Sequence, residues 1–259
     1  IDVLSYLGEK EEDIDFIMKN YPSNGEIFYI CKKDSPTIKK TRYVNDYTNS
    51  KLIGFYEIND DLLNVEDENG FNEIISKHVE NHDIVIEVDY GHGLISRKSQ
   101  NNIREKSKFL AANSQINSFN ARFHDLSYYK DLDLLCINET ELYSHYRTRE
   151  VPIEKLMLKL KSEINCVNLI TTRGSKGSIG IDAESNIIHC PSYAKEIIDR
   201  VGAGDAYLAA ASIALGAGAP LITSMFIASI LAGKVVGDLG TGSTIHFKDL
   251  WKTIEALLK

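Results

Sequence analysis

From residue 69 onward, short apolar runs typical of buried strands alternate with longer segments rich in helix formers. This alternation predicts right-handed βαβ units, in which parallel strands form one sheet and helices cover its faces. The expected helices span residues 71–81, 98–112, 153–164 and 206–215, and the expected strands span 83–88, 132–137, 167–171, 178–181 and 194–198. We therefore predict an α/β fold with a mostly parallel sheet. Ligands of such sheets bind beyond the carboxyl ends of the strands, so functional residues should follow strands.

The first part of the chain lacks this alternation. Residues 26–31, 41–47 and 51–57 are rich in β-branched and aromatic residues, with no helix expected between them. Consecutive strands of this kind predict a small antiparallel sheet. The chain has 259 residues and 43% hydrophobic content, enough to bury a full core. We therefore predict a single domain over residues 1–259 that carries the antiparallel sheet at about 26–57.

The composition argues against several classes of protein. The net charge is −8 and no dense Lys/Arg stripe is present, so we expect neither nucleic acid nor a membrane as a partner. No apolar run approaches the ~20 residues of a membrane span, and the first residues do not resemble a signal peptide, so we expect a cytoplasmic protein. The cysteines are scattered and mostly lie in apolar runs, which predicts reduced core thiols instead of disulfides or a zinc site. They are Cys31, Cys136, Cys166 and Cys190.

The most informative motif is the turn at residues 199–206, Asp-Arg-Val-Gly-Ala-Gly-Asp-Ala. It opens the helix expected at 206–215, and the first N–H groups of a helix, together with its dipole, favour an anion. A carboxylate beside an anion site is unfavourable for binding alone, but a base that takes a proton from an attacking hydroxyl belongs there. Alternatively, Asp205 merely caps its helix, because Asp is a preferred N-cap residue.

This segment resembles the C-terminal signature of the ribokinase, or PfkB, family of carbohydrate and nucleoside kinases, usually Asp-Thr-x-Gly-Ala-Gly-Asp. Arg200 replaces the usual threonine. The remaining positions are in register, namely Asp199, Gly202, Ala203, Gly204, Asp205 and the aromatic Tyr207. The resemblance implies a ribokinase-like three-layer fold, an anion hole formed by Gly202, Ala203 and Gly204, and Asp205 as catalytic base.

Other strand ends resemble the nucleotide site of this family. Asn138 and Glu141 match an Asn-x-x-Glu element that organises Mg²⁺ through water, although a capping pair at a helix start explains the same residues. Thr172, Gly174 and Gly177 match a nucleotide-binding turn, although a hairpin loop is the simpler explanation. Residues 228–237 resemble the helix beside the adenine, with Ser229 in place of an asparagine, although small residues also suit tight helix packing. The implied cofactors are ATP, Mg²⁺ and a monovalent cation such as K⁺.

The sugar side of the site is less distinct. Asp89, in Asp-Tyr-Gly-His-Gly, resembles a sugar-binding residue of heptose kinases, although it could simply form an Asx turn. His92 in the same loop is expected only to make local hydrogen bonds. Lys40 and Arg42 align with the edge of the family's β lid, where they would meet a substrate phosphate, unless they lie on a solvated strand pair. Asn113 begins an amide-rich stretch that could bind the substrate or form an ordinary polar loop.

The order of these motifs favours an ATP-dependent sugar kinase, and the nearest resemblance is to heptose-phosphate kinases of the ADP-heptose synthase type and to PfkB kinases linked to nucleotidyltransferases. The alternative is a non-catalytic nucleotide- or sugar-binding module of a fused nucleotidyltransferase. A dinucleotide-dependent oxidoreductase is excluded, because no Gly-x-Gly-x-x-Gly follows the first strand. Residues 1–8 resemble the strand and turn after the family's first βα units, so we expect those units to be missing from this sequence. The lid implies a homodimer.

Overall fold

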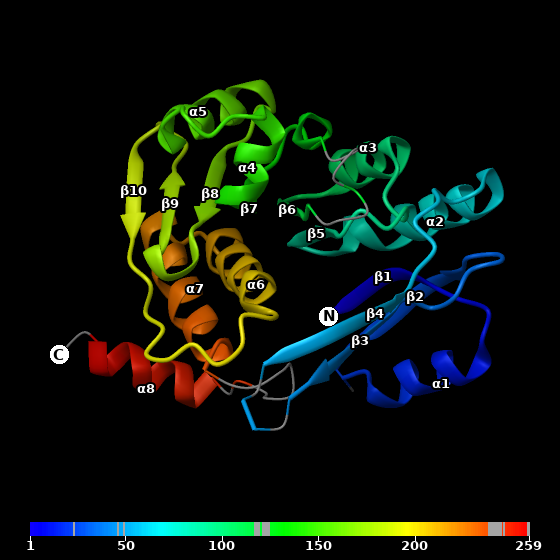
Figure 1. Cartoon of the computed structure of the whole chain (residues 1–259). Coiled ribbons are helices and arrows are strands. Elements are labelled where there is room, and N and C mark those ends of the chain that lie inside the picture. The colour runs from blue at the N-terminus through cyan, green and yellow to red at the C-terminus, as the bar shows by residue number, and fades with distance from the viewer. Residues whose placement is uncertain are drawn as a thin grey trace. The chain divides into compact units, whose positions relative to one another are not determined.

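The computed structural model describes residues 1–22, 24–45, 47, 48, 50–116, 120, 125–237, 245 and 247–257 (Figure 1). The chain divides into two compact units. Unit 1 contains residues 1–82, 89–107 and 116–123, and unit 2 contains residues 83–88, 108–115 and 124–259. None of the helices in the described part of the chain is long and apolar enough to cross a bilayer.

The largest sheet has six strands in the order β10-β9-β8-β7-β6-β5. The strands are β5 (Val85–Asp89), β6 (Leu110–Ser114), β7 (Leu134–Asn138), β8 (Asn168–Thr172), β9 (Ser178–Ile181) and β10 (Ile187–Cys190). Strands β6, β7 and β8 are parallel, whereas β8, β9 and β10 pair antiparallel. Four of the five residues of β7 are buried, as expected for a parallel strand that is covered on both faces.

The described residues of unit 2 include the helices α4 (Glu139–Tyr146), α5 (Ile153–Glu163), α6 (Ala203–Gly216), α7 (Leu221–Val235) and α8 (Phe247–Leu257). Short 3₁₀ helices lie at η2 (Leu126–Tyr128) and η3 (Gly174–Lys176). Helices α6 and α7 pack side by side (Figure 1), and their buried residues meet Leu134 and Cys136 of β7 in one core cluster. Because successive strand residues point to opposite faces, Leu135 and Ile137 face the other side of the sheet. Helices α4 and α5 contact the same strands, and α5 buries apolar residues at helical spacing.

Unit 1 begins with β1 (Asp2–Leu7), α1 (Glu11–Asn20) and β2 (Glu26–Cys31), and the two strands pair in parallel. Strands β3 (Lys39–Val44) and β4 (Lys51–Glu57) form a separate antiparallel pair. Helix α2 (Val65–His78) continues into η1 (Val79–Asn81) and packs against α3 (Arg97–Lys106) and β2. The side chains of Asn64 and Ser96 cap α2 and α3, each by accepting a backbone N–H three residues later.

Most predicted elements are present, and three predictions are wrong. The helix expected at 98–112 ends at Lys106, and residues 110–112 lie in β6, where they are almost fully buried. Residues 194–198 form no strand. Residues 26–31 pair in parallel with β1 instead of joining the antiparallel pair, because α1 supplies a βαβ crossover that the sequence analysis missed. Strand β10 and helices α4 and α8 were also missed. The expectation of buried thiols is confirmed for Cys136, Cys166 and Cys190, and all four cysteines are free.

Candidate functional site

The N-terminus of α6 is built on a glycine in the left-handed region. Gly202 is the N-cap residue, with φ 81° and ψ −8°, a conformation that residues with a side chain rarely adopt. The approach is a tight turn, because the Val201 N–H donates to the Asp199 carboxylate at 3.1 Å. The first bond of the helix runs from Ala206 N to Gly202 O at 2.9 Å. Of the N–H groups before it, that of Ala203 makes only a long bond to the Arg200 carbonyl, at 3.5 Å, and none has an acceptor within the helix, so the turn suits an anion.

Asp205 lies in the first turn of α6 and is exposed. The alternative that Asp205 is the N-cap residue is wrong, because Gly202 holds that position and makes no side-chain cap bond. An acidic residue in the first helical turn interacts favourably with the dipole, which accounts for about 0.3–1 kcal/mol at an exposed position. The carboxylate is therefore stabilising at this position and exposed at the start of the helix.

Gly204 has no structural reason to be glycine. Its φ is not in the positive range, and a Cβ placed there would have no heavy atom of the described residues within 4 Å apart from its chain neighbours and the backbone of its own helix. Glycine inside a helix is less favourable than alanine by up to about 1 kcal/mol. The bare backbone at Gly204 is thus a feature that the fold does not require, and close approach of a ligand would require it.

The segment before the turn is held along α7. Ser229 Oγ, on α7, donates to the Pro191 carbonyl at 2.8 Å, and a Cβ at Gly233 would lie 2.9 Å from Ala194 N. At the end of the helix, the Val236 carbonyl accepts the N–H groups of Ile198 and Asp199 at 2.7 and 3.1 Å. The small residues of α7 therefore allow this segment to pack closely against the helix. Ser229 as a residue is only 6% exposed, and its contact with adenine stays a prediction.

Tyr207 connects the anion turn to the neighbouring loop. Its hydroxyl lies 2.8 Å from Ser178 Oγ and donates to the Met225 carbonyl at 3.4 Å. Burial raises the pKa of Tyr207 far above its ordinary value, so the hydroxyl stays neutral. Tyr207 lies two residues after Asp205, and Ser178 directly follows Gly177. Their hydrogen bond therefore links the start of α6 to the predicted nucleotide turn.

The segment from Arg173 to Gly177 joins the antiparallel strands β8 and β9. It is therefore a hairpin loop, as the alternative in the sequence analysis proposed. Its two glycines differ. Gly177 has φ 81°, and a Cβ there would lie 2.1 Å from the Cys190 carbonyl oxygen, so this position tolerates only glycine. Gly174 also has a positive φ, of 58°, but a Cβ there would meet no described heavy atom within 4 Å apart from its chain neighbours and the backbone of its own short helix. The loop therefore presents open backbone at Gly174.

Asn138 and Glu141 form a capping box at the start of α4. Asn138 Oδ1 accepts the Thr140 N–H at 2.8 Å, and Glu141 Oε2 accepts the Asn138 N–H at 2.7 Å. The capping alternative is therefore confirmed as geometry. It does not exhaust the acceptor capacity of a carboxylate, which has about four lone-pair sites.

These motifs meet at one edge of the sheet in unit 2. Asn138 pairs in register with Thr172, and Thr172 pairs with Ser178. Thr172 Oγ1 donates to the Ile137 carbonyl at 3.4 Å. Arg173 on the loop and Glu139 on α4 form an ion pair at 3.2 Å. The capping box, the loop and, through Tyr207, the anion turn are thus contiguous.

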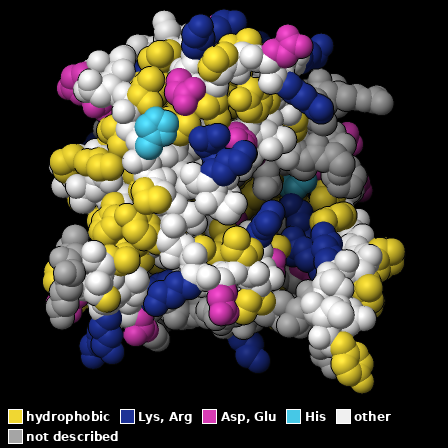
Figure 2. All heavy atoms as spheres, turned by 60° about the vertical axis from the view of Figure 1, so that its left-hand side comes forward, with side chains coloured by type: hydrophobic (Ala, Val, Ile, Leu, Met, Phe, Trp, Pro, Cys, Tyr) yellow, Lys and Arg dark blue, Asp and Glu magenta, His cyan; other side chains and the backbone are white. Residues whose placement is uncertain are grey.

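Asn113 lies on β6 of the same sheet, where its Nδ2 donates to the Cys136 carbonyl at 2.8 Å. The structure therefore gives Asn113 a bond to a neighbouring strand, and it is not the first residue of a loop. Its contact with a substrate stays a prediction. On the face drawn in Figure 2, Lys and Arg side chains gather in places although the net charge of the chain is −8. Positive charge is thus concentrated locally on a chain that is acidic as a whole.

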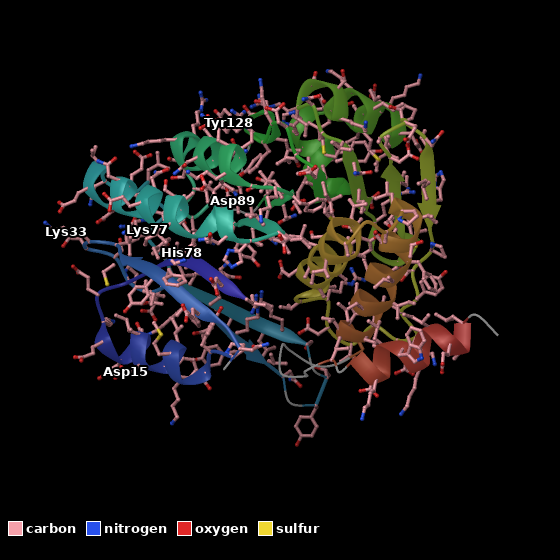
Figure 3. All side chains as sticks on the ribbon, turned by 180° about the vertical axis from the view of Figure 1, so that it is seen from behind. Asp15, Lys33, Lys77, His78, Asp89 and Tyr128 are labelled. Atoms are coloured by element: carbon pink, nitrogen blue, oxygen red, sulfur yellow. The ribbon has the colours of Figure 1, made fainter. Side chains whose placement is uncertain are left out.

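The remaining predicted substrate residues lie in unit 1. Asp89 stands at the end of β5 (Figure 3), and its Oδ1 accepts the Gly91 N–H at 2.7 Å, which is the Asx turn weighed above. Lys40 Nζ lies 5.0 Å from the centre of the Tyr90 ring, a cation–π contact that links β3 to the loop of Asp89. Arg42 is exposed on β3, opposite Gly54.

Sequence reasoning missed Lys32 and Asp60 near this loop, and it did not predict the buried pairing of His92 with Asp60. Lys32 is 3% exposed, and His92 is 7% exposed and lies 2.8 Å from Asp60 through its Nδ1. The only signal in the sequence was the pair of glycines around His92. A pairing between residues 32 positions apart leaves no local pattern.

Comparisons with known proteins place these features in a family. The sequence model described as pfkB family carbohydrate kinase matches residues 32–248. The chain is 31% identical over 231 residues to the bifunctional protein HldE of Haemophilus influenzae, which covers 88% of this chain and 46% of that protein. It is 28% identical over 260 residues to the protein of the same name from Shewanella amazonensis, covering 98% of this chain and 51% of that protein. The chain thus spans about half the length of the curated relatives it matches.

Solved structures show the same fold at low sequence identity. Phosphofructokinase-2 from Escherichia coli in complex with potassium superposes with a TM-score of 0.80 at 14% identity, covering 100% of this chain and 82% of that one. Ribokinase from Thermotoga maritima superposes with a TM-score of 0.71 at 20% identity, covering 99% and 80%. The predicted ribokinase-like α/β fold, with a mostly parallel sheet and additional antiparallel strands, is therefore confirmed.

Proposed function

Since the chain belongs to the pfkB family of carbohydrate kinases, we propose that it transfers the γ-phosphoryl group of ATP to a hydroxyl of a sugar or sugar phosphate. The observation that carries the proposal is the continuity of three motifs in unit 2: the α6 turn with Asp205, the glycine loop after β8 and the capping box after β7. Each follows a strand or opens a helix at one edge of the sheet, where α/β proteins bind ligands.

Asp205 is the proposed general base. Its carboxylate would take the proton of the attacking hydroxyl, while the amides of Gly202, Ala203 and Gly204 stabilise the charge that develops on the transferred group. Gly204 supports this role, because its backbone is open without a structural need. Thr172, Gly174 and Gly177 would contact the nucleotide phosphates.

Mg²⁺ fits the residues at the start of α4. No group of three or more potential metal-binding side chains occurs in the part of the chain that the structure describes, so a metal here would rely on water and phosphate oxygens for most of its ligands. Carboxylate and amide oxygens suit this hard cation, and Glu141, through water, and Asn138 would hold it. The bound ion would neutralise charge on the β- and γ-phosphates. A monovalent cation such as K⁺ is a further proposed cofactor.

The acceptor is proposed to be a heptose phosphate or a similar sugar. The motifs of the chain resemble those of heptose-phosphate kinases, and the relatives described above are both named bifunctional protein HldE. Asp89 would bind a sugar hydroxyl, with Asn113 as a second polar contact, and Lys40 and Arg42 would bind a substrate phosphate. The same relatives are named bifunctional, so we also propose a fused or adjacent nucleotidyltransferase domain as a partner. A homodimer through β3 and β4 completes the proposal.

The test is an ADP-release assay on the complete protein with D-ribose, fructose 6-phosphate and D-glycero-β-D-manno-heptose 7-phosphate. We expect turnover, and Asp205→Asn should lower kcat by ~10²–10⁴ with little change in ATP affinity. Asp249→Asn is the matched control, because Asp249 is also an exposed acidic residue in a first helical turn, on α8. Near-normal turnover of Asp205→Asn would exclude the base assignment. ATP binding without turnover of any sugar would favour a non-catalytic binding module.

A further inference from the structure

His92 has one buried ring nitrogen that the protein does not use. The side chain is 7% exposed, and its Nδ1 lies 2.8 Å from Asp60 Oδ1. Its Nε2 is buried and has no hydrogen-bond partner among the described residues. Leaving a buried polar atom without a partner is costly, and native structures rarely do so without a reason.

The environment of His92 holds the ring in place. Lys32 Nζ donates to the carbonyls of Asn59 and Asp61 at 2.7 and 2.5 Å, so it fixes the backbone on both sides of Asp60. The Tyr6 hydroxyl donates to the His92 carbonyl at 3.3 Å.

The next glycine in the loop adds to this rigidity. Gly93 has φ 79°, and a Cβ there would lie 2.1 Å from the Asp61 carbonyl oxygen. The Leu63 N–H also donates to the Gly93 carbonyl at 3.3 Å. The backbone after His92 thus packs directly on the loop that carries Asp60, and only glycine fits there.

Asp60 determines which ring nitrogen carries the proton. A carboxylate that accepts from Nδ1 stabilises the Nδ1–H tautomer, and the neutral ring then presents Nε2 as an acceptor. The groups around the ring are the Asp60 carboxylate, the Tyr6 hydroxyl on its backbone, and Tyr90, whose ring is stacked at 6.4 Å between centroids. None of these donates to Nε2. The complementary ligand group is a hydrogen-bond donor, and a sugar hydroxyl is one.

We propose that His92 Nε2 accepts a hydrogen bond from a hydroxyl of the acceptor sugar, with Asp60 as the residue that positions the ring. The proposal rests on the proposed kinase function for the identity of the ligand. It is supported by the loop itself, since His92 lies three residues after Asp89 and stacks on Tyr90, which in turn contacts Lys40. Two of the sugar-side residues predicted from sequence, Asp89 and Lys40, are thus in or against the same loop of unit 1.

Two substitutions separate the nitrogen atoms of His92. His92→Asn keeps an amide nitrogen near the place of Nδ1, where it can donate to Asp60, but removes Nε2. His92→Gln extends a polar group toward the place of Nε2. With D-glycero-β-D-manno-heptose 7-phosphate, His92→Asn should raise the sugar KM about tenfold, the loss expected for one buried hydrogen bond, with kcat and the KM for ATP within twofold of wild type. His92→Gln should recover part of the loss.

Asp60→Asn tests the positioning role. An asparagine can donate to Nδ1 and so moves the proton to Nε2, which then cannot accept from a hydroxyl. Side-chain ¹⁵N spectra of the histidine-labelled full chain should show Nε2 unprotonated in the wild type and protonated in Asp60→Asn, with a similar rise in the sugar KM. A merely structural pair would change the thermal midpoint without this combination.

The outcomes distinguish this proposal from the kinase proposal. Wild-type turnover with an unchanged sugar KM in His92→Asn, and no movement of the Nε2 resonance when the heptose phosphate is added, would overturn the role of His92 alone. Movement of that resonance without turnover of any sugar would support sugar binding by His92 and refute the kinase activity. If no sugar is turned over and the Nε2 resonance does not move, both proposals are overturned.

Discussion

Gly204→Ala is expected to raise the thermal stability of the protein and to lower its catalytic activity. Alanine is favoured over glycine in a helix by up to about 1 kcal/mol, and in the first turn of α6 we expect about 0.5–1 kcal/mol. No strain opposes this gain, because the φ of Gly204 is not positive and, outside its chain neighbours and the backbone of its own helix, the added Cβ would meet no described heavy atom within 4 Å. For a chain of this length, the gain corresponds to a rise in the thermal midpoint of about 1–4 °C.

The loss of activity follows from the same geometry. The new methyl group would occupy the space through which a phosphate must approach the amides at the start of α6, so binding and transfer of the phosphoryl group should both weaken. We expect kcat/KM for ATP to fall by at least tenfold, measured by ADP release, while thermal unfolding shows the stabilisation. Gly70→Ala is the matched control, because Gly70 lies inside α2 with only an ordinary 3.8 Å contact at its Cβ position.

Gly70→Ala should stabilise the protein similarly and leave turnover unchanged. If Gly204→Ala also kept full turnover, the space above Gly204 would not be used by the nucleotide. If it instead lowered the thermal midpoint, the packing argument itself would be incorrect.

Two further predictions concern stability. Gly177→Ala should lower the free energy of unfolding by about 2 kcal/mol or more, since it adds a collision with the Cys190 carbonyl to an unfavourable φ, whereas Gly174→Ala should lower it by only about 1 kcal/mol. Urea unfolding of the two variants measures the difference. Equal losses would contradict the predicted collision. Burial raises the pKa of Tyr6 to about 12, with Asp60 as a smaller cause. The folded state therefore holds this proton more tightly than the unfolded state, whose pKa is about 10, so the stabilisation is complete below pH 10 and is lost as the pH rises toward 12. Tyr6→Phe should flatten the fall in unfolding free energy over that range, and an unchanged slope would exclude this explanation.

The accuracy of the sequence predictions depended on how local the determining interactions are. Residues 132–137 and 178–181 were identified as strands because their apolar runs are short and bounded by turn residues. Residues 110–112 were assigned to a helix because leucine and alanine favour helices locally. The structure buries them in β6 instead, and burial in a sheet outweighs a preference of a few tenths of a kcal/mol per residue.

The candidate site shows the same division. Asp205 and its glycines were predictable because the turn, the helix start and the carboxylate are adjacent in the chain. The φ of Gly202 requires glycine, whereas nothing in the fold requires glycine at position 204. The sequence could not predict this difference, since it shows the same residue type at both positions. The link from Tyr207 to Ser178 was equally hidden, because 29 residues separate the two hydroxyls.

The sequence by itself determined the fold class, the order of the motifs and the place of the anion turn, because periodicity, turn residues and helix starts depend on neighbours within a few positions. Tertiary structure alone decided which glycines are required by a neighbouring carbonyl, that Ser229 supports the segment before the turn, and that Asp60 meets His92. These outcomes depend on atoms brought together across tens of residues, and no local pattern encodes such a contact.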